Sequence, residues 1–433
     1  MLLVAGGLLV AAGVAVGASQ LSEGGKPNPP RLRTIALARC SALHYEGAGS
    51  PQFLIAGDLP LQPGALETTT PMVDAMTLAL ERRNYMAGPY RVGLQVCDDA
   101  TAGGVPVFDA GTCRANAHEY ATNPSVIGVV GPLVSGCAML EIPILNRARG
   151  GAVSIVSPST TYVGLTRRVG PGDPDQPGVF YPTGRRNYAR VLPADDVQAA
   201  ADAILARRLG AKRVYALDDG EPIGRLFVDD FVRAARRLGL AVAGRGSWDV
   251  RQRSYASLAG AIAQTGADDV FLGVPSRPES IRLLRDLRAR LGRAVQFMAP
   301  EVFDPAAARL AGTAAEGMTI SQPGPPNDQL TGEGKQFVAS FSKRFRAEPS
   351  RYAVAAAQAM DVLLDAIAHS DGSRASVTSN LFTTRVSNGI FGSFWITPTG
   401  DTTLNAVAIY RIVRGKATTF ATVVVPDALM GSD

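Results

Sequence analysis

The chain has 433 residues, 46% of them hydrophobic, so it can bury a large core and is long enough for about two or three domain-sized units. Its formal net charge of +5 is too small over this length to indicate nucleic acid binding. No cluster of Lys and Arg alternates with aromatic residues either. We therefore expect a globular protein and exclude a nucleic acid partner.

The N-terminal sequence indicates export. Residues 1–18 are all apolar or glycine, and a polar stretch and a Pro-rich linker follow up to residue 30. Small residues ending at Ala18 suit a signal peptidase, but the run lacks a preceding basic residue and is also just long enough to span a membrane. We expect residues 1–30 to be a signal peptide or a membrane anchor plus linker. Either one places the remainder outside the cytoplasm, secreted or anchored to the outer face of the cytoplasmic membrane.

The cysteines agree with export. An even number of cysteines in an exported chain indicates disulfides, and this chain has four: Cys40, Cys97, Cys113 and Cys137. None has C-x-x-C spacing, and the chain contains only three histidines. We therefore expect no metal site.

Strands and helices alternate from residue 31 onward. We predict strands at 34–39, 92–97, 125–131, 152–157, 187–192, 213–218, 240–246, 268–273, 295–299 and 316–320. Helices are predicted between them, among them 69–84, 137–149, 195–208, 224–238, 255–265 and 278–291. After residue 326 come helices at 329–346, 352–369 and 374–382, then antiparallel strands at 394–396, 405–413 and 419–425. The pattern predicts an α/β protein with two doubly wound parallel-sheet lobes.

Two hydroxyl-rich loops follow neighbouring buried strands. The strand at 125–131 ends in the loop 132–136, with Ser135 at an expected helix N-cap, and the next strand ends in the loop 157–161. Both loops leave from the carboxyl ends of parallel strands, where open α/β folds bind ligands. We predict that they bind one small anionic group, because two such loops together are the stronger signal, although each hydroxyl alone is better explained as a cap or a turn residue.

Several segments resemble one family. Residues 131–135 followed by 156–161 resemble the paired ligand loops of type I periplasmic solute-binding proteins, most closely the leucine/isoleucine/valine-binding receptors of ABC transporters. Further similar segments follow in the same order at 190–198, 209–219, 297–301 and 391–401. The resemblance extends over residues 32 to 425.

The resemblance implies two lobes joined by three crossovers that close on a ligand. Lobe 1 would contain residues 31–191 with 322–388, and lobe 2 residues 192–321 with 389–427. The implied ligand-binding residues are Ser135, Gly136, Ser159, Thr160 and Thr161 for a carboxylate, Asp195 and Glu301 for an α-ammonium, and Asp219. The alternatives are a helix N-cap for Asp195 and a solvated loop charge for Glu301. No cofactor is implied.

The implied function is capture of a small polar ligand, an amino acid or related carboxylate, and its delivery to an ABC permease. A branched-chain ligand is not assumed, because residues 219–223 and 273–275 lack the aromatic residues that relatives often have there. Two alternatives are a ligand-sensing ectodomain tethered by residues 1–18 and a secreted hydrolase. We do not expect an enzyme, because Ser135 lies outside a G-x-S-x-G motif and no histidine follows a strand on the ligand edge.

The sheet order also predicts the disulfides. Cys97 and Cys113 flank one insertion, and the neighbouring first and third strands of a flavodoxin-like sheet end near Cys40 and Cys137. We predict the pairs Cys97–Cys113 and Cys40–Cys137, with Cys113–Cys137 as the rival. Two Gly- and Pro-rich insertions, 41–64 and 162–186, are expected near the rim of the cleft as lids, partner surfaces or long loops.

Overall fold

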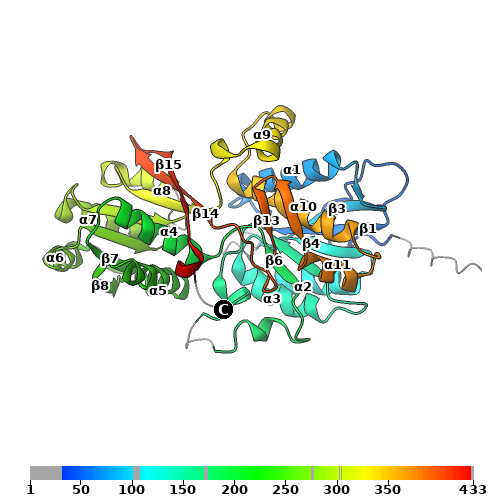
Figure 1. Cartoon of the computed structure of the whole chain (residues 1–433), viewed down its shortest axis with the longest axis horizontal. Coiled ribbons are helices and arrows are strands. Elements are labelled where there is room, and N and C mark those ends of the chain that lie inside the picture. Colours follow the sequence, from blue (N-terminus) through cyan, green and yellow to red (C-terminus); the bar gives the residue numbers. More distant parts are fainter. Residues whose placement is uncertain are drawn as a thin grey trace, which may run out of the picture.

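The computed structural model describes residues 32–100, 108–169, 174–274, 277–301, 303 and 305–430. The predicted signal peptide or anchor in residues 1–30 lies outside these residues. In the described part of the chain, no helix combines the length and apolarity needed to cross a membrane. Two α/β lobes lie beside each other, each built around its own sheet, which confirms the predicted fold class (Figure 1).

The sheet of the first lobe has the strand order β2-β3-β1-β4-β5-β6. Its strands are β1 (Phe53–Leu59), β2 (Met86–Ala87), β3 (Tyr90–Asp98), β4 (Val126–Val130), β5 (Ser154–Ser157) and β6 (Tyr188–Arg190). All pairs are parallel except β2 with β3. One face packs against α1 (Leu66–Arg82), α9 (Gly332–Phe345), α10 (Arg351–Ala368) and α11 (Arg374–Leu381). The other face packs against α2 (Ala110–Thr122) and α3 (Ser135–Asn146).

The sheet of the second lobe has the order β15-β14-β11-β10-β9-β7-β8. Its strands are β7 (Arg213–Asp218), β8 (Ala241–Ser247), β9 (Asp269–Gly273), β10 (Gln296–Pro300), β11 (Thr319–Pro323), β14 (Ala406–Val413) and β15 (Lys416–Val424). β14 runs antiparallel to both of its neighbours, β11 and β15. One face packs against α4 (Asp195–Arg208) and α5 (Pro222–Arg237), and the other against α6 (Ala256–Gln264), α7 (Pro278–Leu291) and α8 (Pro305–Ala311).

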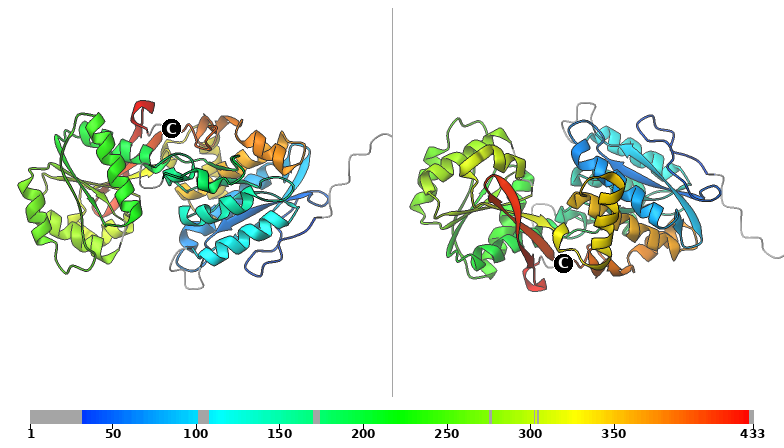
Figure 2. Two further views of the ribbon diagram at one scale, coloured as in Figure 1. Left: turned by 90° about the horizontal axis from the view of Figure 1, so that it is seen from below. Right: turned by 90° about the horizontal axis from the view of Figure 1, so that it is seen from above.

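The chain passes between the two sheets three times. The crossing segments are residues 191–194, 324–331 and 396–405, which link elements of different sheets. Figure 2 shows from below and from above that the lobes stay side by side in both views. The hairpin of β12 (Arg385–Gly389) and β13 (Gly392–Trp395) buries Ile390 and Phe394 in the core of the first sheet. We therefore place the third crossing after residue 395 instead of at 389, and the remaining lobe boundaries stay a prediction.

The first strand was predicted in the wrong place. The structure has no strand at 34–39, and β1 lies inside the segment 41–64 that we expected to be an insertion. Gly57 and Asp58 weaken the strand pattern of β1, yet the glycine fits a tightly packed place, because an added Cβ would lie 3.1 Å from the Val96 side chain and 3.2 Å from the end of Met76. The stretch around Cys40 instead meets β3 through isolated antiparallel bridges.

Both predicted disulfides are wrong. The structure pairs Cys40 with Cys97 and Cys113 with Cys137, so the rival pairing is confirmed. Cys40 does not end the first strand but lies opposite Cys97, with the two Cα atoms 3.9 Å apart. Cys113 and Cys137 open α2 and α3, which pack side by side. The bridges join residues separated by 57 and 24 positions, and each constrains the unfolded chain by about 3–4 kcal/mol in the chain-entropy model.

Three buried carboxyl groups surround the Cys113–Cys137 bridge. Asp58, Asp99 and Glu141 are fully buried, and each has at least one oxygen without a hydrogen-bond partner among the described residues. Burial, followed by the charges of its neighbours, raises the pKa of Asp99 to about 9. Burial also raises the pKa of Asp58 to about 6 and that of Glu141 well above its usual range. The folded protein therefore favours the protonated forms of these groups.

We expect this cluster to make the protein less stable as the pH rises. A folded-state pKa above the unfolded value means that the folded state holds a proton which the unfolded state releases, so stability present at low pH is lost as the pH rises through the folded pKa. For Asp99 that interval runs from 3.8 to about 9. Asp99→Asn should remove the contribution of this carboxyl group to the loss, on the order of 4 kcal/mol between about pH 5 and pH 8. Urea unfolding at a series of pH values measures this.

The matched control is Asp249→Asn. Hydrogen bonds from Arg251 lower the pKa of the exposed Asp249 to about 2, so both folded and unfolded states are ionised above about pH 5. Above about pH 5, the free energy of unfolding of this variant should change with pH as that of the unmodified protein does. If the unfolding free energy of Asp99→Asn also changes with pH as that of the unmodified protein does, Asp99 does not cause the loss of stability at high pH.

Candidate ligand site between the lobes

The two hydroxyl-rich loops lie side by side and are bonded to each other. Their strands β4 and β5 are paired, with Val130 opposite Val156. Ser157 Oγ donates to the Pro132 carbonyl at 3.0 Å, and Ser159 Oγ donates to the Leu133 carbonyl at 2.9 Å. The close packing at the strand end requires Gly131, whose φ is +141° and whose added Cβ would lie 2.3 Å from the Asp58 carbonyl oxygen.

The first turn of α3 carries free donors. Ser135 is the first residue of α3 and not its N-cap, because Val134 holds that position without a side-chain bond. Ser135 Oγ accepts the N–H of Tyr162 at 3.4 Å, so its hydroxyl hydrogen can still be donated. The first N–H groups of a helix have no partners within the helix, and its dipole favours an anion there. Gly136 packs closely against Phe108, because an added Cβ would lie 2.5 Å from the Phe108 ring.

The second loop ends in two threonines with different surroundings. Thr160 is buried, and its hydroxyl is bonded to the Tyr188 hydroxyl, so it belongs to the core. Thr161 accepts the N–H of Asp195 through its carbonyl at 2.9 Å. Its side chain also lies close enough to the Asp195 carboxylate to lower the pKa of that group, against the larger effect of burial, which raises it. Thr161 therefore joins the loop to the start of α4, just after the first crossing.

Asp195 and Glu301 lie within electrostatic reach of each other, as their proposed common role requires. Asp195 opens α4, but Ala194 is the N-cap and no side chain caps the helix, so the capping alternative is wrong. Burial is the main cause that raises the pKa of Asp195 to about 7, while Thr161 lowers it and Glu301 raises it further. Burial also raises the pKa of Glu301, whose carboxylate accepts a hydrogen bond from Gln198 Nε2.

A buried ionic network, which sequence reasoning missed, holds this region in place. Arg190, at the end of β6, is fully buried and donates to the Thr160 and Tyr162 carbonyls at 3.2 and 3.0 Å. Its Nε donates to Asp401 Oδ1 at 2.8 Å, in the third crossing. Arg167 bridges Asp401 to Asp196, with N–O distances of 2.8 Å. The network ties the second ligand loop to two crossings and fixes residue 167 of the predicted insertion against them.

Sequence reasoning also missed polar side chains around Glu301. Gln198 Nε2 donates to the carbonyl and the hydroxyl of Ser321, both at 3.0 Å. Arg351 opens α10 with its guanidinium 4.2 Å over the Tyr352 ring. Gln198 and Arg351 are buried in spite of their polarity, and no local pattern in the sequence indicates this burial.

Asp219 has partners of its own. It follows β7 on the second sheet, where Arg277 Nη2 lies 3.2 Å from its carboxylate and Glu221 donates its N–H at 3.2 Å. Burial is the main cause that raises its pKa. No contact in the described part of the chain joins Asp219 to Asp195 or Glu301, so its role as a ligand residue stays a prediction.

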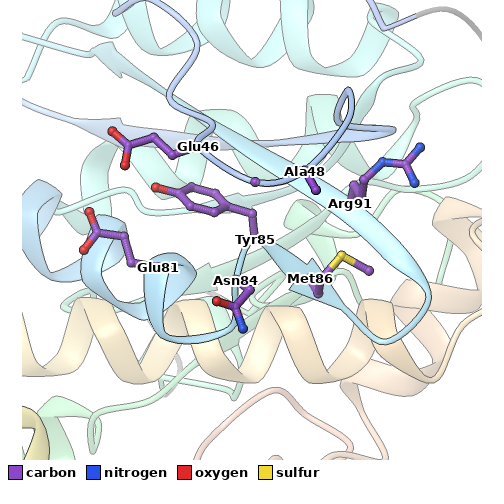
Figure 3. Close-up of a pocket in the computed structure, with 8 residues that line it drawn as sticks. Glu46, Ala48, Glu81, Asn84, Tyr85, Met86 and Arg91 are labelled. Atoms are coloured by element: carbon purple, nitrogen blue, oxygen red, sulfur yellow. The ribbon is translucent and has the colours of Figure 1, made fainter.

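A cavity of about 690 Å³ lies at the other end of the first sheet. Figure 3 shows Tyr85 between Glu46 and Glu81, with Arg91 at the opposite side of the cavity. Arg91 is near the start of β3, whereas the ligand loops follow the carboxyl ends of β4 and β5. This cavity is therefore separate from the candidate ligand site.

Among the residues that the structure describes, two groups of acidic and cysteine side chains come close enough to share an ion. They are Asp99 with Cys113 and Cys137, and Asp58 with Cys137 and Glu141. Both include sulfurs of the Cys113–Cys137 disulfide, which offer no thiolate.

Comparison with known proteins identifies relatives of the same fold. The family model described as periplasmic binding protein matches residues 63–417. The leucine-binding protein LivK from Thermotoga maritima MSB8 has a similar structure, with a TM-score of 0.68 and 23% identity over 87% of this chain and 99% of that chain. An ABC transporter substrate-binding protein from Desulfitobacterium hafniense, in complex with Leu, has a TM-score of 0.69 and 20% identity over 85% and 99%.

A further structural relative binds a different compound. The solute-binding protein of an ABC transporter from Rhodopseudomonas palustris BisB5, in complex with 3,4-dihydroxybenzoic acid, has a TM-score of 0.65 and 17% identity over 87% and 98%. No curated protein matches the chain. The family match extends over most of the sequence and agrees with the two-lobed fold. The chain therefore belongs to the periplasmic binding protein family.

Proposed function

We propose that this protein is an extracytoplasmic solute-binding protein that captures an amino acid or related carboxylate by closure of its lobes and delivers it to an ABC permease. The observation that carries the proposal is the meeting of two hydroxyl-rich loops with the Asp195 and Glu301 carboxyls at the first crossing. Donors lie at one end and carboxyls at the other, which suits a zwitterion. The ligands of the structural relatives, Leu and 3,4-dihydroxybenzoic acid, share a carboxyl group.

The hydrogen bonds divide the proposed ligand residues into two groups. We assign the carboxylate to the Ser135 hydroxyl and the first N–H groups of α3, because these donors are free to bind it. The hydroxyls of Ser159 and Thr160 already bond within the protein, so these residues and Gly136 shape the loops. Thr161 holds the backbone of Asp195 and so places this carboxylate for the ammonium group.

A screen of ligands by thermal shift tests this function. We expect at least one L-amino acid, amide or small aromatic acid to raise the unfolding midpoint, because a ligand at a hundred times its Kd stabilises the folded state by about 2.7 kcal/mol. The D-enantiomer of a stabilising amino acid is the matched control and should give a smaller shift. Absence of any shift would contradict the ligand class, and NMR evidence of turnover would contradict a receptor.

A tethered sensory ectodomain of the same fold is the alternative, favoured by the apolar residues 1–18. Genes for a permease and an ATPase beside this one would favour transport. A kinase or cyclase domain encoded in the same reading frame would favour sensing.

A further inference from the structure

Arg351 has an unusual environment for a buried charge. It is only 8% exposed, and its Nη1 donates to the Pro323 carbonyl at 2.6 Å. Its Nε and Nη2 are buried and have no hydrogen-bond partner among the residues that the structure describes. A buried guanidinium without partners is unfavourable, because it loses the hydrogen bonds that water would supply.

The other buried arginines are satisfied by the protein. Arg167 and Arg190 form ion pairs with Asp196 and Asp401. Arg374 donates from all three guanidinium nitrogens to backbone carbonyls, including those of Val126, Ala121 and Tyr120 at 2.9 Å. Among the arginines that are less than a tenth exposed in the described chain, Arg351 alone keeps buried nitrogens without partners. The protein itself therefore does not complete the surroundings of this side chain.

The position of Arg351 places it beside the candidate ligand site. Pro323 ends β11, and its neighbouring strand β10 leads directly into Glu301. Gln198 bonds both to Ser321 of β11 and to the Glu301 carboxylate. The charge of Arg351 opposes the rise in the pKa of Glu301 that burial causes. Arg351 lies over the ring of Tyr352, whose pKa is raised mainly by burial and also by the charges of Glu301 and Asp195. Arg351, at the start of α10, therefore lies near Glu301 of the proposed ammonium site.

We infer that Arg351 binds an anionic group of the ligand, in addition to the carboxylate held by the first turn of α3. The inference rests on the proposed function and narrows the ligand to a solute with two acidic groups. An acidic L-amino acid fits this pattern. Its ammonium group lies at Asp195 and Glu301, its α-carboxylate at Ser135 and its side-chain acid at Arg351, so that each charge meets an opposite partner or donor.

Calorimetry with matched pairs of ligands tests this inference on the full chain. The probes are L-glutamate against L-glutamine, L-aspartate against L-asparagine, and L-leucine. We expect at least one acid to bind tenfold or more tightly than its amide and than L-leucine. Arg351→Gln should reduce the acid-to-amide ratio to about one, mainly by weakening the acid, and Arg351→Lys should restore part of it. Arg251→Gln, a change at an exposed arginine, should leave the ratio unchanged.

The outcomes separate the two proposals. An unmodified protein that binds an amide, L-leucine or a monocarboxylate as tightly as the acids would overturn the role of Arg351 and leave the receptor function intact. Equal weakening of all ligands by Arg351→Gln would also overturn it and would point to a contact between the lobes. Failure to bind any solute would refute the receptor function and the inference together.

Discussion

Arg190→Ala is expected to lower the free energy of unfolding by about 3–5 kcal/mol, because it removes a buried guanidinium that donates to several groups of an ionic network at once. Arg190 is fully buried between Asp401 and the carbonyls of Thr160 and Tyr162. The substitution leaves these three acceptors without the charged donor and opens a cavity. Urea unfolding followed by circular dichroism measures the loss.

A surface pair supplies the control for this experiment. Arg245 and Asp229 form an ion pair and are 48% and 50% exposed, so Arg245→Ala should cost less than about 1 kcal/mol. Asp401→Ala combined with Arg190→Ala should destabilise much less than the sum of the single changes, because both remove the same contact. Additive single effects, or a loss for Arg190→Ala no greater than for Arg245→Ala, would contradict the importance of the network.

The network also connects stability to ligand binding. Arg190 holds the backbone of the second ligand loop, and Asp401 and Asp196 belong to the third crossing and to the helix after the first. A change at Arg190 that still folds should therefore weaken ligand binding through the loop. That coupling is expected of residues that position a site without contacting the ligand.

Local patterns in the sequence were sufficient to predict most of the architecture. The bounds of α4 and α7 agree with the predicted helices at 195–208 and 278–291, and β7 agrees with the predicted strand at 213–218. Each is a regular element with a clear period and a defined end. The pairing of the two loops followed from the parallel sheet order alone.

The failures came from residues whose structure depends on distant contacts. β1 contains Gly57 and Asp58, which suit a strand only because Met76 and Val96 pack over the glycine and Asn116 binds the carboxylate. Misplacing β1 moved Cys40 to the wrong strand end, and both disulfide predictions failed with it. One early error thus changed the predicted covalent structure.

The candidate site was predicted in part for the same reason. Its loops and its two carboxyls occur in recognisable segments, whereas the partners of Arg190 and Arg351 lie far away in the sequence. Buried arginines give no local signal, because Arg is usually exposed and the sequence does not reveal what covers it. Only the folded structure identified which arginines are paired and which one is not.

Glu301→Gln is expected to weaken binding of an amino acid ligand by well over tenfold. The change preserves the shape of the side chain and its acceptor for Gln198, but it removes the charge that we assign to the ligand ammonium group. Loss of one partner of a buried, hydrogen-bonded charge pair costs about 2–5 kcal/mol. Calorimetry with the tightest ligand from the thermal-shift screen measures the change, and it should appear mainly as faster dissociation.

Glu333→Gln is the matched control, because Glu333 is a surface carboxylate paired with Arg82 on the first lobe, and its replacement should leave affinity unchanged. A second comparison isolates the ammonium group itself. An analogue of the ligand with a hydroxyl in place of the amine should bind the unmodified protein weakly and should lose little further affinity with Glu301→Gln, since the contact is already absent. Unchanged affinity of Glu301→Gln for the amino acid would remove Glu301 from the site and leave Asp195, with its pKa raised to about 7 by burial, as the acidic partner of the ligand.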